Sequence, residues 1–320
     1  MLKGRKILLT GLTGRVGGAF AERFAADSEL WGLARFSQAG QREYWAAKGV
    51  RTIVGHYADD DLSAVPTDFD YVLHVAADVA PPSFEQGMRD NAEGVGTLMN
   101  HCRSARAFLH VSTVGVYSPN PDFTHRYRED DVCGSGTMGH YCGTKLAGEG
   151  VARTMARLLS LKTVICRLAV QYGTVQGGGM PGSYLKSLLA GETILLPRNQ
   201  GNEFVLVSDQ DLTDFVEPCL AAADVPAATV NWGGDEAVPG PEFIQYLADL
   251  AGVPARWDYY DGTSPPSVPT DNSRRLAITG PCKMHWKDGL KTLYDALHER
   301  FRAEIASGQA SPASSQSQLP

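Results

Sequence analysis

A glycine-rich turn near the N-terminus limits the folds open to this chain more than any other feature of its sequence. The apolar run Lys6–Thr10 is followed directly by Gly11, Gly14 and Gly17, and the residues from Val16 onward have helical spacing. Glycines at a strand-to-helix turn let the backbone bend sharply and approach a diphosphate, while the helix N-terminus offers free N–H groups. The turn therefore predicts a dinucleotide site on a βαβ unit rather than a ligand-free glycine turn.

Short apolar runs continue along the chain and alternate with segments of helical pattern. Strands separated by helices pair in parallel, and continuous apolar strands are buried on both faces. The pattern therefore predicts an α/β fold with a doubly wound, Rossmann-like parallel sheet over residues 1–172. After the first strand, we expect strands at residues 30–34, 52–54, 71–75, 108–111, 163–166 and 229–232.

The second half of the chain has a looser pattern, and we expect a smaller C-terminal substrate-binding region at residues 173–306. Segments around 203–234 are expected to return to the sheet domain. Glycines predict a flexible, lid-like turn cluster at 177–182, and apolar spacing predicts a helix at 242–250. The Ser-, Gln-, Ala- and Pro-rich residues 307–320 predict a disordered tail.

Charge and cysteine content argue against several classes of protein. The 320 residues include 29 Lys and Arg against 36 Asp and Glu, a net charge of −7, whereas nucleic acids and anionic membranes need a basic surface. No apolar run approaches the roughly 20 residues that span a bilayer. The six cysteines have neither C-x-x-C nor metal-like spacing. We therefore expect a cytoplasmic protein with reduced thiols and no metal, whose partner is a small molecule.

The end of the second strand bears on the choice of dinucleotide. NAD sites carry an acidic residue about 20 residues after the glycine turn, whereas an arginine there accommodates the 2′-phosphate of NADP. Arg35 occupies this place, and Arg15 follows Thr13 and Gly14 within the turn. We therefore expect NADP in preference to NAD. Stacking of Arg35 on the adenine, or its exposure to solvent, is the other interpretation.

Tyr141 and Lys145 are four positions apart and so share one face of a helix. A nearby ammonium lowers the pKa of a phenol from about 10, so that the phenol can exchange a proton with a carbonyl or an alcohol. Such a pair alone is usually a solvated contact, but Thr113 lies just past a predicted strand, at the sheet edge where ligands bind. We expect Thr113 to hold the substrate oxygen beside Tyr141; the alternative is a threonine bound to its own backbone.

With these residues, the chain resembles a known family over about residues 5–300. The family is the extended short-chain dehydrogenase/reductases, the NAD-dependent epimerase/dehydratase group. Besides the glycine turn and the Tyr141–Lys145 pair, the shared markers are Asp70–Ala77, Asn91–Gly94, Ser112–Thr113 with Val116–Tyr117, Arg167 with Tyr172–Gly173, Val230–Gly234 and Asp271–Arg274. The resemblance implies a catalytic triad of Thr113, Tyr141 and Lys145.

The resemblance also implies binding residues. Asn91 would support the active-site helix, Ala76 and Ala77 would line the cofactor, and Ser112 and Arg167 would be neighbours of the site. The complete expected cofactor site is Gly11, Thr13, Gly14, Arg15, Val16, Gly17, Arg35, His56, Ala76, Ala77, Asn91, Ser112, Tyr141 and Lys145. We expect Thr113, Arg167 and, from its position along the chain, Met180 at the substrate.

Two departures from the family pattern stand out. His56 follows Gly55 where the family has an aspartate for the adenine amine, so His56 or Asp59 is expected to make that contact. Val114 and Gly115 occupy the places of the acid and base of the dehydratases, which argues against dehydration of a sugar nucleotide.

Three functions are compatible with this site. The two arginines favour an NADPH-preferring reductase of a carbonyl, or dehydrogenase of the alcohol, acting by hydride transfer. The alternative is an NAD-dependent sugar-nucleotide epimerase, which keeps its cofactor bound. A non-catalytic cofactor-binding protein is the third, disfavoured because Tyr141 and Lys145 are both present. Many members of the family form dimers, and a homodimer is the corresponding expectation.

Overall fold

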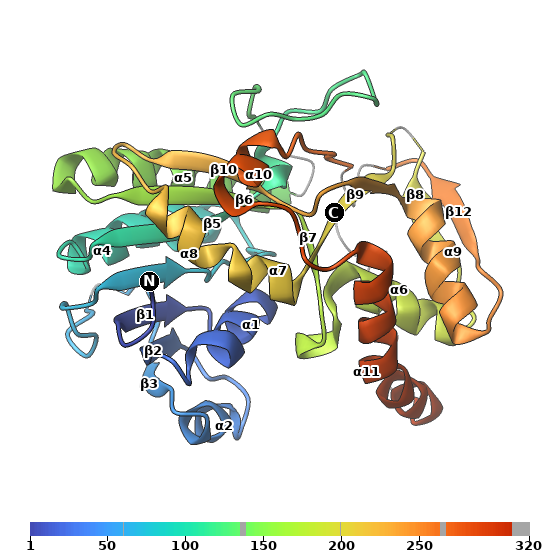
Figure 1. Ribbon diagram of the computed structural model, residues 1–320, viewed down its shortest axis with the longest axis horizontal. Helices are drawn as coiled ribbons and strands as arrows, with labels where there is room; N and C mark the ends of the chain where they lie inside the picture. Colours follow the sequence, from blue (N-terminus) through green and yellow to red (C-terminus); the bar gives the residue numbers. More distant parts are fainter. Residues whose placement is uncertain (60, 135–138, 199, 263–266, 309–320) are drawn as a thin grey trace.

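A seven-stranded sheet forms the larger half of the molecule (Figure 1). The computed structural model describes residues 1–59, 61–134, 139–198, 200–262 and 267–308, so the expected disordered tail lies outside the described residues from 309 onward. All strands of this sheet are parallel, in the order β10-β6-β5-β4-β1-β2-β3. They are β1 (Lys6–Thr10), β2 (Glu29–Ala34), β3 (Arg51–Val54), β4 (Tyr71–His74), β5 (Ala107–Thr113), β6 (Thr163–Leu168) and β10 (Ala228–Trp232). The expected α/β, doubly wound fold is thereby confirmed.

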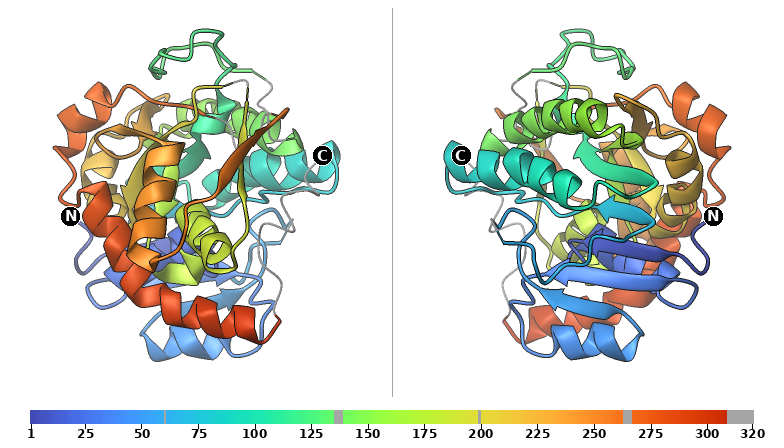
Figure 2. Two further views of the ribbon diagram at one scale, coloured as in Figure 1. Left: turned by 90° about the vertical axis from the view of Figure 1, so that its right-hand side faces the viewer. Right: turned by 90° about the vertical axis from the view of Figure 1, so that its left-hand side faces the viewer.

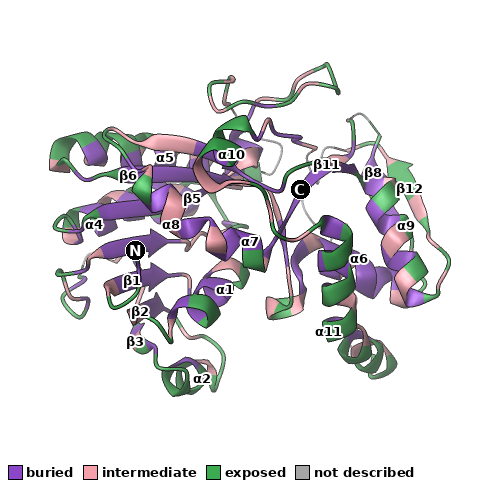
Figure 3. Cartoon of the chain, viewed as in Figure 1, coloured by how far each residue is buried: buried purple, intermediate pink, exposed green. Residues whose placement is uncertain are grey.

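Both faces of the sheet are covered because successive strand residues point to opposite sides. Ile7 and Leu9 enter one core and Leu8 the other, all fully buried. The first core is closed by α1 (Arg15–Phe24), α2 (Gln41–Ala47), α7 (Asp209–Asp214) and α8 (Val216–Ala221). The second is closed by α4 (Gly94–His101) and α5 (Gly139–Leu159), which lie side by side (Figure 2). The inner strands β1, β4, β5 and β6 are accordingly buried along almost all of their length (Figure 3).

The smaller half of the molecule has a core of its own. Its helices are α6 (Gly179–Leu189), α9 (Gly240–Ala251) and α11 (Trp286–Ala306), which pack on one another beside two small sheets (Figure 1). One sheet joins β11 (Ala237–Pro239), β9 (Glu203–Ser208) and β7 (Val170–Tyr172), and the other joins β12 (Trp257–Tyr260) and β8 (Ile194–Pro197). Within the 203–234 segment, β10 pairs with β6 of the large sheet, whereas β9 belongs to the small one.

The glycine cluster at 177–182 differs from the expectation of a flexible turn. Gly177, Gly178 and Gly179 have φ between +69° and +84°, but α6 already begins at Gly179. Pro181 lies in the first turn of that helix, where its missing N–H costs nothing because the first N–H groups of a helix have no intrahelical partner. The glycines thus end the short turn η3 (Val175–Gly177) and start a helix.

Short connecting elements complete the fold. They are α3 (Phe84–Met88), the π-helical turn η1 (Arg89–Glu93), η2 (Val114–Val116) and α10 (Ser273–Thr279). Over the residues that the structure describes, no helix combines the length and the apolar character needed to cross a membrane.

Candidate active site

The glycine turn closes tightly against the end of β4. Gly11 has φ +74°, and a Cβ on it would lie 2.8 Å from the backbone nitrogen of Ala76. A Cβ on Gly17 would lie 2.1 Å from the carbonyl oxygen of Gly11. Gly14 is exposed and precedes α1, and no side chain caps the first N–H groups of this helix. Because those N–H groups are free to bind an anion, the turn fits the diphosphate of a dinucleotide.

The end of β4 is tied to the glycine turn through Thr10. The hydroxyl oxygen of Thr10 accepts hydrogen bonds from the backbone N–H groups of Val75 and Ala76, both at 3.2 Å. Ala76 and Ala77 are half-buried at this edge, next to Gly11. These small side chains leave the edge open along the line that a dinucleotide takes in a doubly wound sheet.

Asn91 connects the loop after β4 to α5. Its Oδ1 accepts from the Asp78 N–H at 2.9 Å, and its Nδ2 donates to the Asp78 carbonyl at 2.8 Å and to Thr144 Oγ1 at 3.1 Å. Asn91 is 1 % exposed. It therefore positions the helix that carries Tyr141 and Lys145 relative to the cofactor edge of the sheet, and its side chain is fully engaged within the protein.

Tyr141 and Thr113 meet at the carboxyl end of β5. The Thr113 hydroxyl accepts from the Gly115 N–H at 3.1 Å. Burial, with a smaller contribution from Cys142, raises the pKa of Tyr141, while the neighbouring Thr113 hydroxyl and the charge of Arg15 act in the opposite direction. The two side chains are half-buried, so the phenol is both held in place and reachable.

Lys145 is buried beneath this pair, with 1 % of its surface exposed. Its Nζ donates to the Val111 carbonyl at 2.8 Å and lies 3.5 Å from His110 Nε2. Burial lowers the pKa of Lys145 to about 8, and the charge of Glu149 opposes this shift. The expectation that Lys145 lowers the pKa of Tyr141 is wrong for this arrangement: the pKa of the phenol is raised, because Lys145 turns toward Val111 and His110 and burial dominates at Tyr141.

Arg167 is engaged in a buried network and is not directed at a substrate. Its guanidinium binds both carboxylate oxygens of Glu149, at 2.8 Å for the shortest contact, and donates to the Glu129 carbonyl at 3.2 Å. Ser112 donates to the same carboxylate at 2.6 Å. Both Ser112 and Arg167 are buried, and through Glu149 they hold α5 against β5 and β6.

The residues expected at the ends of the dinucleotide lie at the surface. Arg15 and Arg35 are both exposed. The charge of Arg15 acts on Tyr141, where it opposes the rise in the pKa of the phenol. The ring of His56 stacks on Tyr57 at 4.5 Å, and its backbone N–H donates to Asp59 at 3.0 Å, so His56 and Asp59 are joined to each other.

Two of the expected site residues pack against the hydrophobic cores, and two interacting residues were missed by sequence reasoning. Met180 packs against the core of the smaller half, and Val16 against the large sheet. Gln176 donates to the Thr13 carbonyl and so links η3 to the glycine turn. Glu149 was missed as the partner of Arg167, although it lies four positions after Lys145 and hence on the same helix face.

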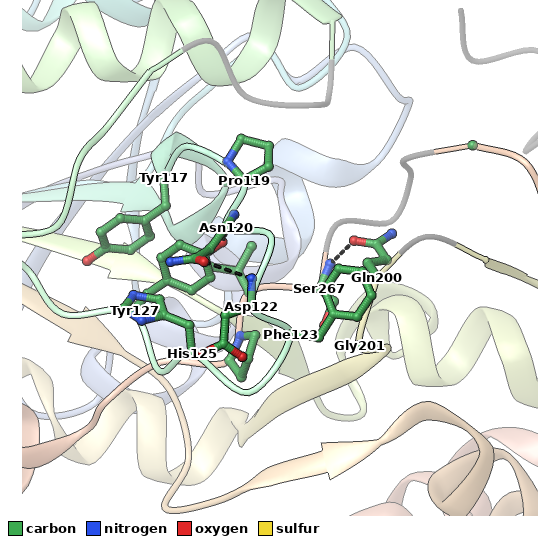
Figure 4. Close-up of a pocket in the computed structure, with 14 residues that line it drawn as sticks. Tyr117, Pro119, Asn120, Asp122, Phe123, His125, Tyr127, Gln200, Gly201 and Ser267 are labelled. Atoms are coloured by element: carbon green, nitrogen blue, oxygen red, sulfur yellow. Dashed lines mark hydrogen bonds between the residues drawn. The ribbon is translucent and has the colours of Figure 1, made fainter.

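A small cavity lies near this site and is lined by none of the predicted site residues. It has a volume of about 100 Å³, between the segment that follows Thr113 and residues 200–201 and 267–269 (Figure 4). Tyr117 and Tyr127 lie on one side, and Phe123 and the hydrogen-bonded Gln200 and Ser267 on the other. The volume is well below the roughly 300 Å³ of the smallest ligand pockets, so this cavity is not itself a nucleotide site.

Comparisons with known proteins decide the family. The model of the NAD dependent epimerase/dehydratase family matches residues 7–228. The chain belongs to this family. Among its curated relatives, UDP-glucuronate 4-epimerases 5 and 6 of Arabidopsis thaliana are 27% and 25% identical to it, each over 78% of this chain and 61% and 58% of their own length. The chain thus spans about three-fifths of the length of these relatives.

Solved structures of the epimerase/dehydratase family share the fold. A variant of the UDP-glucuronic acid 4-epimerase of Bacillus cereus, in complex with a fluorinated UDP-glucuronic acid and NAD, has a TM-score of 0.78 at 20% identity, over 92% of this chain and 99% of that one. A UDP-N-acetylglucosamine 4-epimerase of Methanobrevibacter ruminantium has a TM-score of 0.78 at 16% identity, over 93% and 100%. At these identities the likeness shows the fold.

These findings overturn one expectation. An NADPH-preferring reductase is contradicted, because the curated relatives are 4-epimerases. The preference for NADP also finds no support, since the Bacillus cereus complexes contain NAD. The error came from Arg15 and Arg35: an arginine near the end of the second strand is compatible with a 2′-phosphate, but both side chains are exposed here, and exposure to solvent satisfies a guanidinium equally well.

Proposed function

We propose that this chain is an NAD-dependent 4-epimerase of a UDP-sugar. One observation carries the proposal: a half-buried phenol, Tyr141, lies close enough to the Thr113 hydroxyl at the sheet edge for that hydroxyl to lower its pKa, in a chain whose curated relatives are UDP-glucuronate 4-epimerases. Because the phenol reacts with a hydroxyl or a carbonyl, it suits the transient oxidation of a sugar carbon.

The residues at the sheet edge fit NAD. Gly11, Gly14 and Gly17 with the N-terminus of α1 would hold the diphosphate, and Ala76 and Ala77 would line the nucleotide. Lys145 would donate its remaining N–H to the ribose next to the nicotinamide. NAD supplies a reversible hydride acceptor and a positive charge when bound.

Tyr141 then acts as a proton carrier in both directions. Its Oη, ionised with the help of the positive charge that bound NAD would bring, would take the proton of the sugar hydroxyl as the carbon gives up a hydride to the nicotinamide acceptor, and a ketone would result. After the sugar has turned, the carbon receives hydrogen on its opposite face and Tyr141 returns the proton to the oxygen. The Thr113 hydroxyl would hydrogen-bond to the same sugar oxygen and keep it beside the phenol. Substrate and product are isomers, so the balance requires no external reductant.

The experiment is an epimerisation assay with purified protein. UDP-glucuronate is incubated with the protein and NAD, and the C4 epimer is measured by chromatography; UDP-glucose and UDP-N-acetylglucosamine are tested in parallel. The protein is also denatured, and the released nucleotide is identified. We expect interconversion of at least one UDP-sugar pair without net formation of NADH. Absence of any epimer with all three substrates would overturn the proposal.

A further inference from the structure

Thr10, His74 and His110 lie at one level on three neighbouring strands. The strand register pairs Thr10 with His74 and His74 with His110. Each of the three is at most 1 % exposed. Lys145 of α5 closes this row, because its Nζ lies 3.5 Å from His110 Nε2. The row thus leads from the residue before the glycine turn to the lysine of the active site.

The hydrogen bonds of Thr10 define the protonation of His74. The Thr10 hydroxyl oxygen accepts two backbone N–H groups, so its own proton is left to donate to His74 Nδ1 at 2.8 Å. His74 is therefore the tautomer with its proton on Nε2. Burial, then the charges of Lys145 and His56, lower the pKa of His74 far below its usual value, so the ring is neutral.

The contact with Lys145 defines His110 in the same way. An ammonium only donates hydrogen bonds, so His110 Nε2 accepts and the ring proton lies on Nδ1. Burial, then the charges of Lys145 and His74, lower the pKa of His110, which keeps this ring neutral as well. The two rings stack at 5.3 Å with an angle of 18° between their planes.

If this row of side chains served packing alone, it would lower the stability of the fold. Nε2 of His74 and Nδ1 of His110 are buried and have no hydrogen-bond partner among the residues that the structure describes. Unpartnered buried N–H groups destabilise a fold, and apolar side chains at these two positions would avoid that loss. The polar atom that His110 directs at Lys145 is Nε2.

The ammonium of Lys145 has three N–H donors and two acceptors on β5. Val111 accepts at 2.8 Å and His110 is the second contact, at 3.5 Å. Within the described part of the chain, the third donor has no acceptor. Two of the three N–H donors are thus taken up on the strand side, which leaves the third for a ligand.

We propose that His110 is a positioning residue of the epimerase site: its neutral ring accepts a hydrogen bond from Lys145 and so directs the remaining N–H of the lysine at the bound nucleotide. His74 supports it by stacking and by its bond to Thr10. The catalytic consequence rests on the proposed function, whereas the contact between His110 and Lys145 does not, so the two are tested separately.

The first test determines which ring nitrogen of His110 carries the proton, in the wild-type protein without substrate. Nitrogen-15 NMR of labelled histidine distinguishes a protonated from an unprotonated ring nitrogen. The His110→Gln variant identifies the His110 signals. We expect an unprotonated Nε2 and a protonated Nδ1 from pH 6 to pH 7, where Lys145 is an ammonium. A protonated Nε2, or a charged ring in this range, would overturn the proposal whether or not any variant folds.

The second test measures the titration of the Lys145 ammonium. Lysines are labelled with carbon-13 at Cε, and Lys145→Arg identifies the signal. An acceptor stabilises the ammonium, so its loss should lower the titration midpoint from about 8 by roughly half a unit or more. We expect this shift in His110→Phe and in His110→Asn, whose amide reaches only the place of Nδ1. His110→Gln, whose amide oxygen reaches the place of Nε2, should keep the midpoint.

Leu109→Val is the matched control, since Leu109 is buried on the same strand but faces the other core. It should lose stability and keep the midpoint. With an active UDP-sugar, we further expect kcat to fall about tenfold in His110→Asn with KM changed less than about twofold, and His110→Gln to restore most of kcat. An unshifted midpoint in the folded Asn or Phe variant would overturn the proposal, whereas inactive wild-type protein would count against the epimerase alone.

Discussion

Glu149 and Arg167 form a two-point ion pair between α5 and β6, with the closest contact at 2.8 Å and side chains that are 5% and 8% exposed. Ser112, next to Thr113 on β5, donates to the same carboxylate at 2.6 Å. Three elements are therefore joined next to Thr113. The ion pair holds α5 against β6, and the Ser112 hydrogen bond holds it against β5, which carries Thr113.

Breaking this pair should destabilise the fold strongly. In Glu149→Ala the guanidinium of Arg167 stays buried without its partner, so we expect a loss of about 3–5 kcal/mol in the free energy of unfolding. The double variant Glu149→Leu with Arg167→Met removes both charges and should lose less than Glu149→Ala. Urea unfolding measures both. The single variants Glu149→Leu and Arg167→Met complete the comparison, and a double variant that loses the sum of their two effects would show that the pair is not coupled.

Tyr141→Phe tests the proton carrier. Removal of the phenol oxygen leaves the glycine turn intact, so we expect epimerisation to fall by about 10²–10⁴-fold while the affinity for NAD changes less than about twofold. Turnover and NAD binding by calorimetry are the measurements. Tyr44→Phe, at an exposed tyrosine, is the control. A Tyr141→Phe protein with near wild-type turnover contradicts the assignment.

Lys145 makes stability depend on pH in a definite direction. Burial lowers its pKa from 10.5 to about 8. Between these values the unfolded chain binds a proton that the folded protein does not, so this group adds stability as the pH rises from 8 to 10.5. The Lys145→Met variant has no titratable group at this position and so lacks this gain in stability. We therefore expect the variant to become less stable relative to wild type from pH 8 to pH 10.5, as measured by urea unfolding. A pH-independent difference would argue against the lowered pKa.

Asp209 makes the stability of the protein fall, rather than rise, as the pH increases. It begins α7, where burial raises the pKa of its carboxyl from 3.8 to about 6, against the opposing hydrogen bond from Gln171. From about pH 4 to pH 6 the folded protein binds a proton that the unfolded chain has lost, so wild-type stability falls as the pH rises. Asp209→Asn should gain about 1–3 kcal/mol relative to wild type over this range. Thermal unfolding at pH 4, 5 and 6 gives the comparison, and parallel curves for both proteins would contradict it.

Gly17→Ala tests the glycine turn. A Cβ at this position would lie 2.1 Å from the Gly11 carbonyl oxygen, so the turn must open. We expect the affinity for NAD to fall by at least about tenfold, or 1.4 kcal/mol. Gly150→Ala on α5 is the matched control, because nothing lies within 4 Å of its Cβ and alanine favours a helix by about 1 kcal/mol. Unchanged NAD affinity in a folded Gly17→Ala protein would refute the diphosphate site.

The alternation of apolar runs and helical segments was sufficient to predict the parallel sheet. Each of the strands expected from 6–10 to 229–232 is present, within a few residues of its expected ends. Local sequence suffices there because continuous apolar strands can be buried only inside such a sheet. The strands β7, β8, β9, β11 and β12 escaped prediction, since they belong to two small sheets that are stabilised by packing against the rest of the smaller half.

The sequence by itself determined the glycine turn, because only glycine fits at Gly11 and Gly17, and the shared helix face of Tyr141 and Lys145. Tertiary structure alone decided what surrounds them. The stack of His74 and His110, the pairing of Arg167 with Glu149, and the direction of the Lys145 ammonium all arise where strands distant in sequence lie side by side. Protonation and hydrogen bonding depend on burial and on neighbours in space, and a linear pattern specifies neither.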